Sequence, residues 1–515
     1  MIETIILAIY FVMILVLGFY STHAYLMLYY YWKMKRAERA GIIPKRRRLQ
    51  SIKGAPLVTV QLPIFNEKYV APRSIKSVCA MDYPKDRLEI QVLDDSTDET
   101  SFIVGQVVDE YKSKGYDIKV IRRNNRKGYK AGALQEGLAI AKGEFIAIFD
   151  ADFIAPRRFL NVTIPYFNSK DKVAAVQTRW GHLNKDYSML TLGQAVALDG
   201  HFYIEQKLRS DNGYFINFNG TCGIWRKEAI YDAGGWESDT LTEDLDLSYR
   251  AQLRNWKIVF VRDMVVPGEV PVDFNGFRAQ QYRWTKGAFE TARKLMGPVM
   301  KSKLPLKVKY EAFVHLTNNM VFPLLFGLVM LALPVLIIKI DHPDTLRWYF
   351  LILSAFTISV FPYPIIYGIT NKNLYKIKKK NNKSIPFATR FSYILVPLFL
   401  IGGFMSLSLS NTWAIIKGIQ RKPTEFTRTP KFNIVSKKDR IQSKKYVEKI
   451  SPICFIELIL TFYLLVTTTY AVIASQFTLL PFLMLYTMGF GYMSVASIYQ
   501  TAVNRFSLVY QPEKA

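Results

Sequence analysis

The stretch EFIAIFDAD, residues 144–152, joins a short apolar run to two acids and decides the fold class. Phe145–Phe149 is apolar throughout, which is typical of a strand inside a sheet. Asp150 and Asp152 follow directly, and alternate residues of an extended chain point to the same side. The stretch therefore predicts a strand that presents two carboxylates together at its carboxyl end.

The region between residues 56 and 300 alternates such apolar runs with amphipathic helical stretches. Because this alternation is typical of an α/β fold with a mainly parallel sheet, we expect ligands at the carboxyl ends of the strands. No G-x-x-x-x-G-K-[ST] or G-x-G-x-x-G motif follows a strand, which argues against P-loop and dinucleotide sites. Strands are predicted at Leu57–Phe65, Leu88–Leu93, Ile118–Ile121, Phe145–Phe149 and Val173–Gln177, and helices at about 70–81, 100–113 and 129–141.

Two pairs of acids follow predicted strands. Asp150 and Asp152 offer hard oxygen ligands, which suit Mg²⁺ or Mn²⁺ shared with a nucleotide diphosphate. The alternative is a strand-to-turn junction in which an aspartate caps the next helix. Asp94 and Asp95 end the second strand and are predicted to meet the base, the ribose or the metal, again with helix capping as the alternative.

The segment Thr240–Leu241–Thr242–Glu243 matches a capping box, which predicts a helix start. Asp244 would lie in the first turn of that helix, where the helix dipole favours negative charge. Because a general base must stay ionised and oriented, we predict Asp244 as the base and group Glu243 with it. The structural and the catalytic interpretation of this segment are compatible.

The motif Gln280–Gln281–Tyr282–Arg283–Trp284 is expected on an amphipathic helix that approaches a membrane. Arg283 offers a planar fork to phosphate oxygens, and Trp284 offers a flat face for a sugar ring. The alternative is interfacial anchoring, which is common for Arg and Trp at bilayer surfaces.

Apolar runs flank this hydrophilic region and divide the chain into four parts. The first run, Ile5–Tyr31, lacks Lys, Arg, Asp and Glu, and its length and the basic cluster behind it favour a retained anchor over a signal peptide. The predicted parts are a transmembrane anchor at 1–32, a basic linker at 33–54, a cytosolic domain at 55–300 and a membrane domain at 301–515. Crossings are expected at about 311–338, 348–370, 452–474 and 477–499.

The net charge of +27 is concentrated beside these runs. Residues 33–53, 371–383 and 417–450 together carry 26 Lys and Arg against four acids. This placement fits the positive-inside rule and attraction to anionic lipids, and it argues against nucleic-acid binding. It predicts a multi-pass protein of an inner or plasma membrane, with the hydrophilic domain in the cytoplasm.

Basic residues on both sides of 390–419 conflict with a full crossing, so this segment is predicted to be interfacial or re-entrant. Five crossings result, with six as the alternative. Glu457, just inside a crossing, is expected to snorkel toward the cytosol rather than line a pore. The scattered cysteines predict no disulfide framework, and the dispersed histidines make a zinc site unlikely on chemical grounds.

With these motifs in place, residues 55–500 resemble family 2 glycosyltransferases of the cellulose synthase and β-mannan synthase type, which implies a GT-A domain. By that resemblance, Pro63 and Glu67 of the PIFNE segment contact the nucleotide, and Lys130 of KGYKAG meets its phosphates. The loop Phe218, Asn219, Gly220 and Thr221 lies beneath the acceptor sugar. Gln280 to Trp284 matches the Q-Q-x-R-W pattern of processive members. Residues 424–432, with Phe426–Thr427 and with Thr429 and Lys431 as nucleotide contacts, resemble a gating loop, and 390–419 resembles an interfacial helix.

The chain departs from the cellulose synthase pattern at Ser96, which replaces a glycine, in its single N-terminal span, and in lacking a following cyclic-dinucleotide domain. These differences favour a mannan, glucomannan or other β-glycan over cellulose. The expected activity is inverting, metal-dependent hexosyl transfer from a UDP- or GDP-sugar, coupled to export of the product. The alternatives are transfer of one sugar to a lipid acceptor and a transporter with a noncatalytic regulator. The oligomeric state stays open.

Overall fold

The computed structural model describes residues 1–41, 54–168, 171–380, 387–421, 428–436, 439 and 451–509. Within them, the hydrophilic domain is built on a seven-stranded sheet with the order β3-β2-β1-β4-β6-β5-β7. The pairs β1–β2, β1–β4, β2–β3 and β5–β7 are parallel, whereas β6 runs antiparallel to β4 and β5. The strands are β1 Val58–Ile64, β2 Leu88–Asp94, β3 Asp117–Ile121, β4 Phe145–Ile148, β5 Val173–His182, β6 Gly223–Arg226 and β7 Lys257–Gly268.

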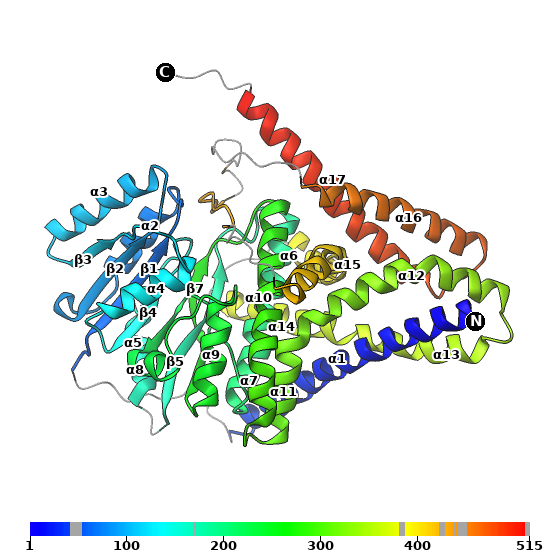
Figure 1. Ribbon diagram of the computed structural model, residues 1–515, viewed down its shortest axis with the longest axis horizontal. Helices are drawn as coiled ribbons and strands as arrows, with labels where there is room; N and C mark the ends of the chain where they lie inside the picture. The colour runs from blue at the N-terminus through cyan, green and yellow to red at the C-terminus, as the bar shows by residue number, and fades with distance from the viewer. Residues whose placement is uncertain are drawn as a thin grey trace.

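Two apolar cores hold helices against the two faces of this sheet (Figure 1). Alternate residues of β1, such as Val60 and Leu62, join one core with α2 (Ala71–Cys79) and α3 (Thr100–Ser113). On the other face, Ile146 and Ile148 of β4 pack with α4 (Tyr129–Ala139) and α9 (Glu243–Leu253). Further helices of this domain are α5 Phe159–Thr163, α6 Met189–Gly200, α7 Lys207–Asp211 and α8 Lys227–Asp232, with a π-helical turn at His201–Gln206.

The five predicted strands and three predicted helices are present, so the α/β prediction is confirmed. The strands β6 and β7 were missed. β6 has only four residues, which is too short to display a period, and β7 carries Arg262 and Asp263 in its middle. β5 also runs on to His182, five residues beyond the predicted end, and its pairing with β7 shifts register between Thr178 and Arg179.

Long apolar helices lie on the side of the molecule away from β3 (Figure 1). Four helical stretches of the described chain are long and apolar enough to cross a membrane: Ile2–Arg39, Leu306–Asp341, Ile453–Ile473 and Leu480–Val503. The first is α1, the second joins α11 (Leu306–Thr317) to α12 (Val321–Asp341), and the others are α16 (Ile453–Ile473) and α17 (Leu480–Val509). These helices are consistent with a membrane protein. Three of them coincide with three of the four crossings predicted after residue 300.

The fourth of those crossings, 348–370, is not one continuous helix. It divides into α13 (Arg347–Ala355), a 3-10 segment (Phe356–Val360) and α14 (Pro362–Lys380). The segment predicted to be interfacial forms α15 (Phe387–Ile419), which Figure 1 shows nearly end-on beside helices seen from the side. Its polar residues turn inward rather than toward solvent, because Ser406, Ser408 and Asn411 are buried between helices.

The helix α10 (Phe274–Lys301) links the sheet to the membrane helices. Its N-terminal residue Phe274 donates its backbone N–H to Gln500 of α17 at 3.2 Å. Arg278 donates from Nη2 to Oε2 of Glu457 in α16 at 2.8 Å, and both side chains are buried. The prediction that Glu457 snorkels is therefore wrong, since this carboxylate instead pairs with a buried guanidinium. The pair holds α10 against α16, one of the helices that could span a membrane.

Candidate active site

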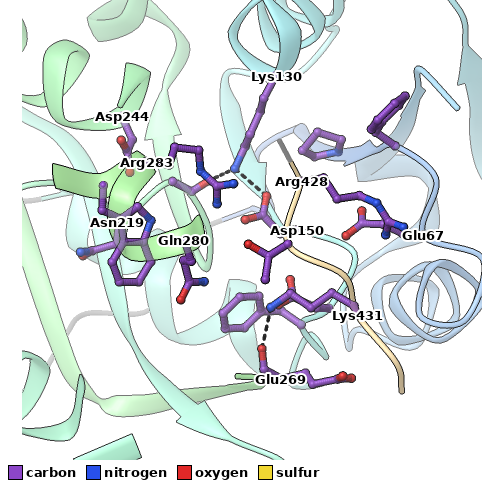
Figure 2. Close-up of a pocket in the computed structure, with 18 of the residues that line it drawn as sticks. Glu67, Lys130, Asp150, Asn219, Asp244, Glu269, Gln280, Arg283, Arg428 and Lys431 are labelled. Atoms are coloured by element: carbon purple, nitrogen blue, oxygen red, sulfur yellow. Dashed lines mark hydrogen bonds and ion pairs between the residues drawn. The ribbon is translucent and has the colours of Figure 1, made fainter. Parts of the chain in front are cut away.

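A cavity opens at the carboxyl end of the sheet, where the segments after β1, β2 and β4 meet α9 and α10. Figure 2 shows Lys130 and Asp150 near its middle, with Asp244 and Arg283 on one side and Glu67 on the other. Most of the predicted site residues line this cavity: Pro63, Glu67, Asp95, Lys130, Asp150, Asp152, Asn219, Gly220, Glu243, Asp244, Gln280, Arg283, Trp284, Thr429 and Lys431.

The end of β4 places Asp150 in the cavity and fixes its backbone. Asp150 donates its backbone N–H to Oγ1 of Thr221 at 2.8 Å. Its Oδ1 accepts from Nζ of Lys130 at 2.6 Å, and the same ammonium donates to the carbonyl oxygen of Gly220 at 3.0 Å. Burial lowers the pKa of Lys130, but the carboxylates of Asp150 and Glu243 outweigh burial and raise it overall. Lys130 is therefore a permanent positive charge beside Asp150.

Asp152 has a second lysine as its partner. Nζ of Lys431 lies 2.6 Å from Oδ2 of Asp152 and donates to the carbonyl oxygen of Glu269 at 2.8 Å. Lys431 belongs to segment 428–436, which reaches the cavity from the membrane domain and whose Phe432 N–H donates to Oε1 of Glu269 at 2.9 Å. Phe426–Thr427 of the predicted gating loop lies outside the described residues.

The negative charges of this region repel one another. Glu67 is surrounded by protein, and burial, followed by the nearby Asp152, raises its pKa to about 8. Burial also raises the pKa of Asp150, against the opposing effect of Lys130. Carboxylates are hard oxygen ligands, and a divalent cation bound here would offset the repulsion among these acids. Asp150 and Asp152 therefore fit Mg²⁺ or Mn²⁺, with Glu67 close by.

Asp244 lies at the start of α9, as predicted, but the predicted capping box is wrong. α9 begins at Glu243 with Thr242 as the N-cap, and no side chain caps it. The hydroxyl of Thr242 instead meets that of Thr291 in α10 at 3.2 Å, because α10 packs against this turn. Oδ1 of Asp244 accepts the backbone N–H of Leu245 at 2.8 Å, which orients the carboxylate.

The acidity of Asp244 is tuned by its surroundings. Burial, followed by repulsion from Glu243, raises the pKa of Asp244 to about 7. Gly220 lies against it with φ at +76°, and a side chain there would place its Cβ only 3.0 Å from Oδ2 of Asp244. Glycine is therefore required at this position both by the backbone conformation and by the close approach.

Gln280, Arg283 and Trp284 lie on α10 and face the same cavity. Burial lowers the pKa of Arg283, and attraction to Glu243 and Asp150 opposes this shift. The guanidinium stays charged, since arginine is protonated across the physiological range. The cavity thus contains a guanidinium that attracts the carboxylates of Glu243 and Asp150.

Three predicted site residues do not line the cavity. Asp94 is buried behind it, where it accepts from Ser96 N at 3.0 Å and from Nε of Arg122 at 3.2 Å. Phe218 is fully buried in the core that covers β4, and Thr221 supports the backbone of Asp150. These three act on the site through their neighbours. The sequence motif could not separate them from Asp95, Asn219 and Gly220, which do line it.

Comparison with known proteins identifies the chain. Residues 55–287 match the family described as glycosyltransferase like family 2. Glucomannan 4-beta-mannosyltransferase 1 of Cyamopsis tetragonoloba is 34% identical over 481 residues, which cover 89% of this chain and 86% of the relative. The chain belongs to the family 2 glycosyltransferases.

Other relatives match the transferase over a shorter region. The probable glucomannan 4-beta-mannosyltransferase 11 of Oryza sativa subsp. japonica is 44% identical over 271 residues, which cover 52% of this chain and 47% of the relative. The chain thus spans about half the length of that relative in the match. A mannosyltransferase from Pyrobaculum calidifontis, solved in complex with GDP-Man and Mn²⁺, superposes with a TM-score of 0.52 at 19% identity, covering 80% of this chain and 99% of the other. This likeness concerns the fold, and the transferase has the expected GT-A type domain.

Several cavity residues of the transferase were not predicted from its sequence: Arg126, Phe153, Trp180, His182 and Glu269. Arg428, which also lines the cavity, lies in the predicted gating loop. Trp180 and His182 stand at the end of β5, beyond its predicted limit, and Glu269 follows β7, which was missed. An extension of the predicted β5 beyond Gln177 would have included Trp180 and His182, which are two residues apart and so lie on the same face of the strand.

A separate acidic cluster of the transferase resembles a metal site but holds a lysine. Glu237, Asp239 and Asp246 have carboxylate oxygens within 4.8 Å of one another. Nζ of Lys294 lies 2.8 Å from Asp239 and 3.0 Å from Asp246 and also contacts Glu237. Its ammonium already neutralises the cluster. Lys294 thereby ties α10 to α9, and so holds the turn that carries Asp244.

Proposed function

We propose that this transferase moves a hexose from a nucleotide-diphosphate sugar to a growing β-glycan, with inversion at the anomeric carbon. The observation that carries the proposal is one cavity lined by Asp150, Asp152, Asp244 and Arg283. A diphosphate leaving group needs positive charge, and an attacking hydroxyl needs a base. Residues suited to both tasks line the same cavity.

The donor would bind with its diphosphate between β4 and α10. Asp150 and Asp152 would hold Mg²⁺ or Mn²⁺, which when bound offsets the charge of the leaving diphosphate. Lys130 and Lys431 pair with these two acids in the structure. In the proposed complex, their ammonium groups turn to phosphate oxygens, and Arg283 binds the leaving group with its planar fork.

Asp244 would remove the proton from the acceptor hydroxyl. Its pKa of about 7 places it where a base can both ionise at neutral pH and accept a proton. The hydroxyl oxygen then forms a bond to the anomeric carbon as the bond to the diphosphate breaks. Because attack comes from the face opposite the leaving group, an α-linked donor gives a β-linked product.

The acceptor terminus would lie between Trp284 and the Asn219–Gly220 turn. Asn219 is held in place because its backbone N–H donates to Oε1 of Gln177 at 2.9 Å, and its Oδ1 accepts from Nε2 of Gln206 at 2.9 Å. The Trp284 indole offers an apolar face to the sugar ring. Gln280, one turn earlier on α10, would contact a sugar hydroxyl.

The two relatives named above support mannose as the transferred sugar and a mannan or glucomannan as the product, because both are named glucomannan mannosyltransferases. GDP-mannose is the proposed donor, and the mannosyltransferase from Pyrobaculum calidifontis was solved with GDP-Man. The cavity's α10 packs against α11 and α17 and pairs with α16 through Arg278 and Glu457, and all three helices belong to stretches able to span a membrane. This contact supports coupled export of a polymer. We place the hydrophilic domain in the cytosol, with five crossings and α15 at the interface, because the basic segments adjoin the apolar ones.

The experiment supplies purified transferase with GDP-mannose, UDP-glucose or UDP-N-acetylglucosamine and Mn²⁺, and then sizes radiolabelled products. The expected result is a ladder of polymer from GDP-mannose. A single glycolipid spot would instead establish the lipid-acceptor alternative, in which one sugar is added per encounter. Absence of transfer and hydrolysis with all three donors would contradict the proposed activity and favour a noncatalytic role.

A further inference from the structure

The cavity extends past the residues that the proposed reaction uses. Trp180 and His182 of β5 and Leu198 of α6 form one side of it, named here the β5–α6 wall. None of them belongs to the three acidic motifs or to the Q-Q-x-R-W motif. We infer that the β5–α6 wall is a second acceptor subsite, which binds the sugar behind the reacting end of the glycan. The inference rests on the proposed function.

The order of strands gives the wall its place in the cavity. Phe65 and Asp95, beside the predicted nucleotide contacts, follow β1 and β2, and Asp150 follows β4. In the sheet, β5 lies on the other side of β4, with β6 between them. Two strand spacings separate Trp180 from the strand of Asp150, a distance of roughly 10 Å. The wall therefore lies on the side of the acidic pair away from the nucleotide.

Trp180 is held so that its ring forms a fixed platform. Its ring centroid is 5.2 Å from that of Phe153 and 5.1 Å from that of Phe202. Its indole N–H is buried and has no hydrogen-bond partner among the described residues. A buried tryptophan N–H usually has a partner, and an indole with an apolar face and a polar edge suits a pyranose ring.

His182 adds polar groups beside this platform. Its side chain is only 4% exposed, and its Nε2 lies 3.5 Å from Oδ1 of Asp199, too far for a good hydrogen bond. Nη1 of Arg179 lies 3.5 Å from the same oxygen. Among the described residues, Nε2 of His182 has no hydrogen-bond partner, whereas Nε of Arg179 donates to the carbonyl oxygen of Arg262 at 3.2 Å. A sugar hydroxyl could therefore pair with His182 beside the Asp199 carboxylate.

The direction of the wall favours the acceptor over the donor hexose. The donor hexose stays bonded to the diphosphate, and so within reach of Arg283 and Asp244. α6, which carries Leu198 and Asp199, packs against α14 and α15 of the membrane domain (Figure 1). A glycan that passes from Trp284 along the β5–α6 wall therefore proceeds toward the membrane helices, as a product that is to be exported must.

The test measures transfer from GDP-mannose with Mn²⁺ to mannose, β-1,4-mannobiose and β-1,4-mannotriose. In the unmodified transferase, the KM for mannobiose should be about tenfold below that for mannose, equal to about 1.4 kcal/mol of binding. Trp180→Ala should remove this gain and leave the KM for GDP-mannose unchanged. Trp180→Phe, which keeps a ring, should restore most of it. Phe102→Ala, at an exposed aromatic on α3, is the matched control and should change neither value.

Because Trp180 also packs on core residues, His182→Gln provides a second variant with less loss of volume. It should raise the KM for mannobiose several-fold without a change in hydrolysis of GDP-mannose by water. A raised donor KM in these variants, or an unchanged preference for mannobiose, would overturn the inference while leaving the proposed function intact. Absence of transfer in the unmodified protein would count against the proposed function itself, and with it against the subsite.

Discussion

The donor half and the acceptor half of the cavity are built in different ways. The donor half consists of short segments that directly follow β1, β2 and β4, so that its residues meet wherever those strands pair. Segment 428–436 adds Lys431 to this donor half, beside Asp152. The acceptor half is assembled from α9, α10 and the end of β5. The first half depends on a local motif, and the second on packing between distant parts of the chain.

The largest expected effect lies where the halves meet, at Asp244. Asp244→Asn removes the proposed base without a change in size and should lower kcat by about 10³-fold, since general bases contribute on this scale. The KM for GDP-mannose should stay within a factor of about two. Asp86→Asn, at an exposed aspartate in the turn before β2, is the matched control. Full activity in Asp244→Asn would show that Asp244 is not the general base.

The next effect tests whether the membrane domain completes the donor half. Lys431→Met leaves Asp152 without its ammonium partner and removes a contact for phosphate. Loss of one member of a buried charge pair should raise the KM for GDP-mannose by about 30-fold or more. Lys142→Met, whose partner Asp117 is on the surface, should have no such effect. An unchanged KM for GDP-mannose in Lys431→Met would show that this lysine of segment 428–436 does not contribute to nucleotide binding.

The dependence on pH sharpens the role of Asp244. Its pKa of about 7 is raised by burial and by Glu243 on its own helix, while Lys130 of α4 and Arg283 of α10 face it as cations. The base must be ionised, so kcat should rise with pH to a plateau above pH 7. At pH 6 it should be about tenfold below that plateau. The same profile in Asp244→Glu but a flat one in Asp244→Asn would support the assignment, whereas a flat profile in the unmodified enzyme would contradict it.

The smallest effect concerns positioning. Lys294→Met removes the ammonium that ties Asp246 of α9 to α10. We expect a few-fold loss of kcat, an unchanged donor KM and a lower melting temperature, because buried Asp246 would lose the ammonium partner on α10 and keep its ion pair with Arg250 on its own helix. Lys257→Met, in an exposed pair with Asp171, is the control. An equal loss in both variants would show that the Lys294 cluster has no particular role.

The same contrast explains what the sequence could predict. Asp150, Asp152 and Asp95 were predicted to lie together because an acid after an apolar run is a local signal, and parallel strands bring such ends together. Glu67, which also lines the cavity, was predicted from the family resemblance alone. Trp180 and His182 were missed because the prediction ended β5 at Gln177. Glu269 was missed because Arg262 and Asp263 interrupt the apolar pattern of β7, the strand that precedes it. The environment of Glu457 was predicted wrongly because its partner Arg278 lies 179 residues away in the sequence, where no local pattern connects the two.

The central claim is that Asp150 and Asp152 hold a divalent cation that binds the diphosphate. Calorimetric titration of GDP into the detergent-solubilised transferase tests it most directly, with and without Mn²⁺. In the unmodified protein, we expect Mn²⁺ to strengthen GDP binding at least about tenfold, which equals about 1.4 kcal/mol. In Asp150→Asn and in Asp152→Asn, we expect Mn²⁺ to leave the affinity for GDP unchanged. Equal affinity for GDP with and without Mn²⁺ in the unmodified protein, or an undiminished Mn²⁺ effect in both variants, would contradict it.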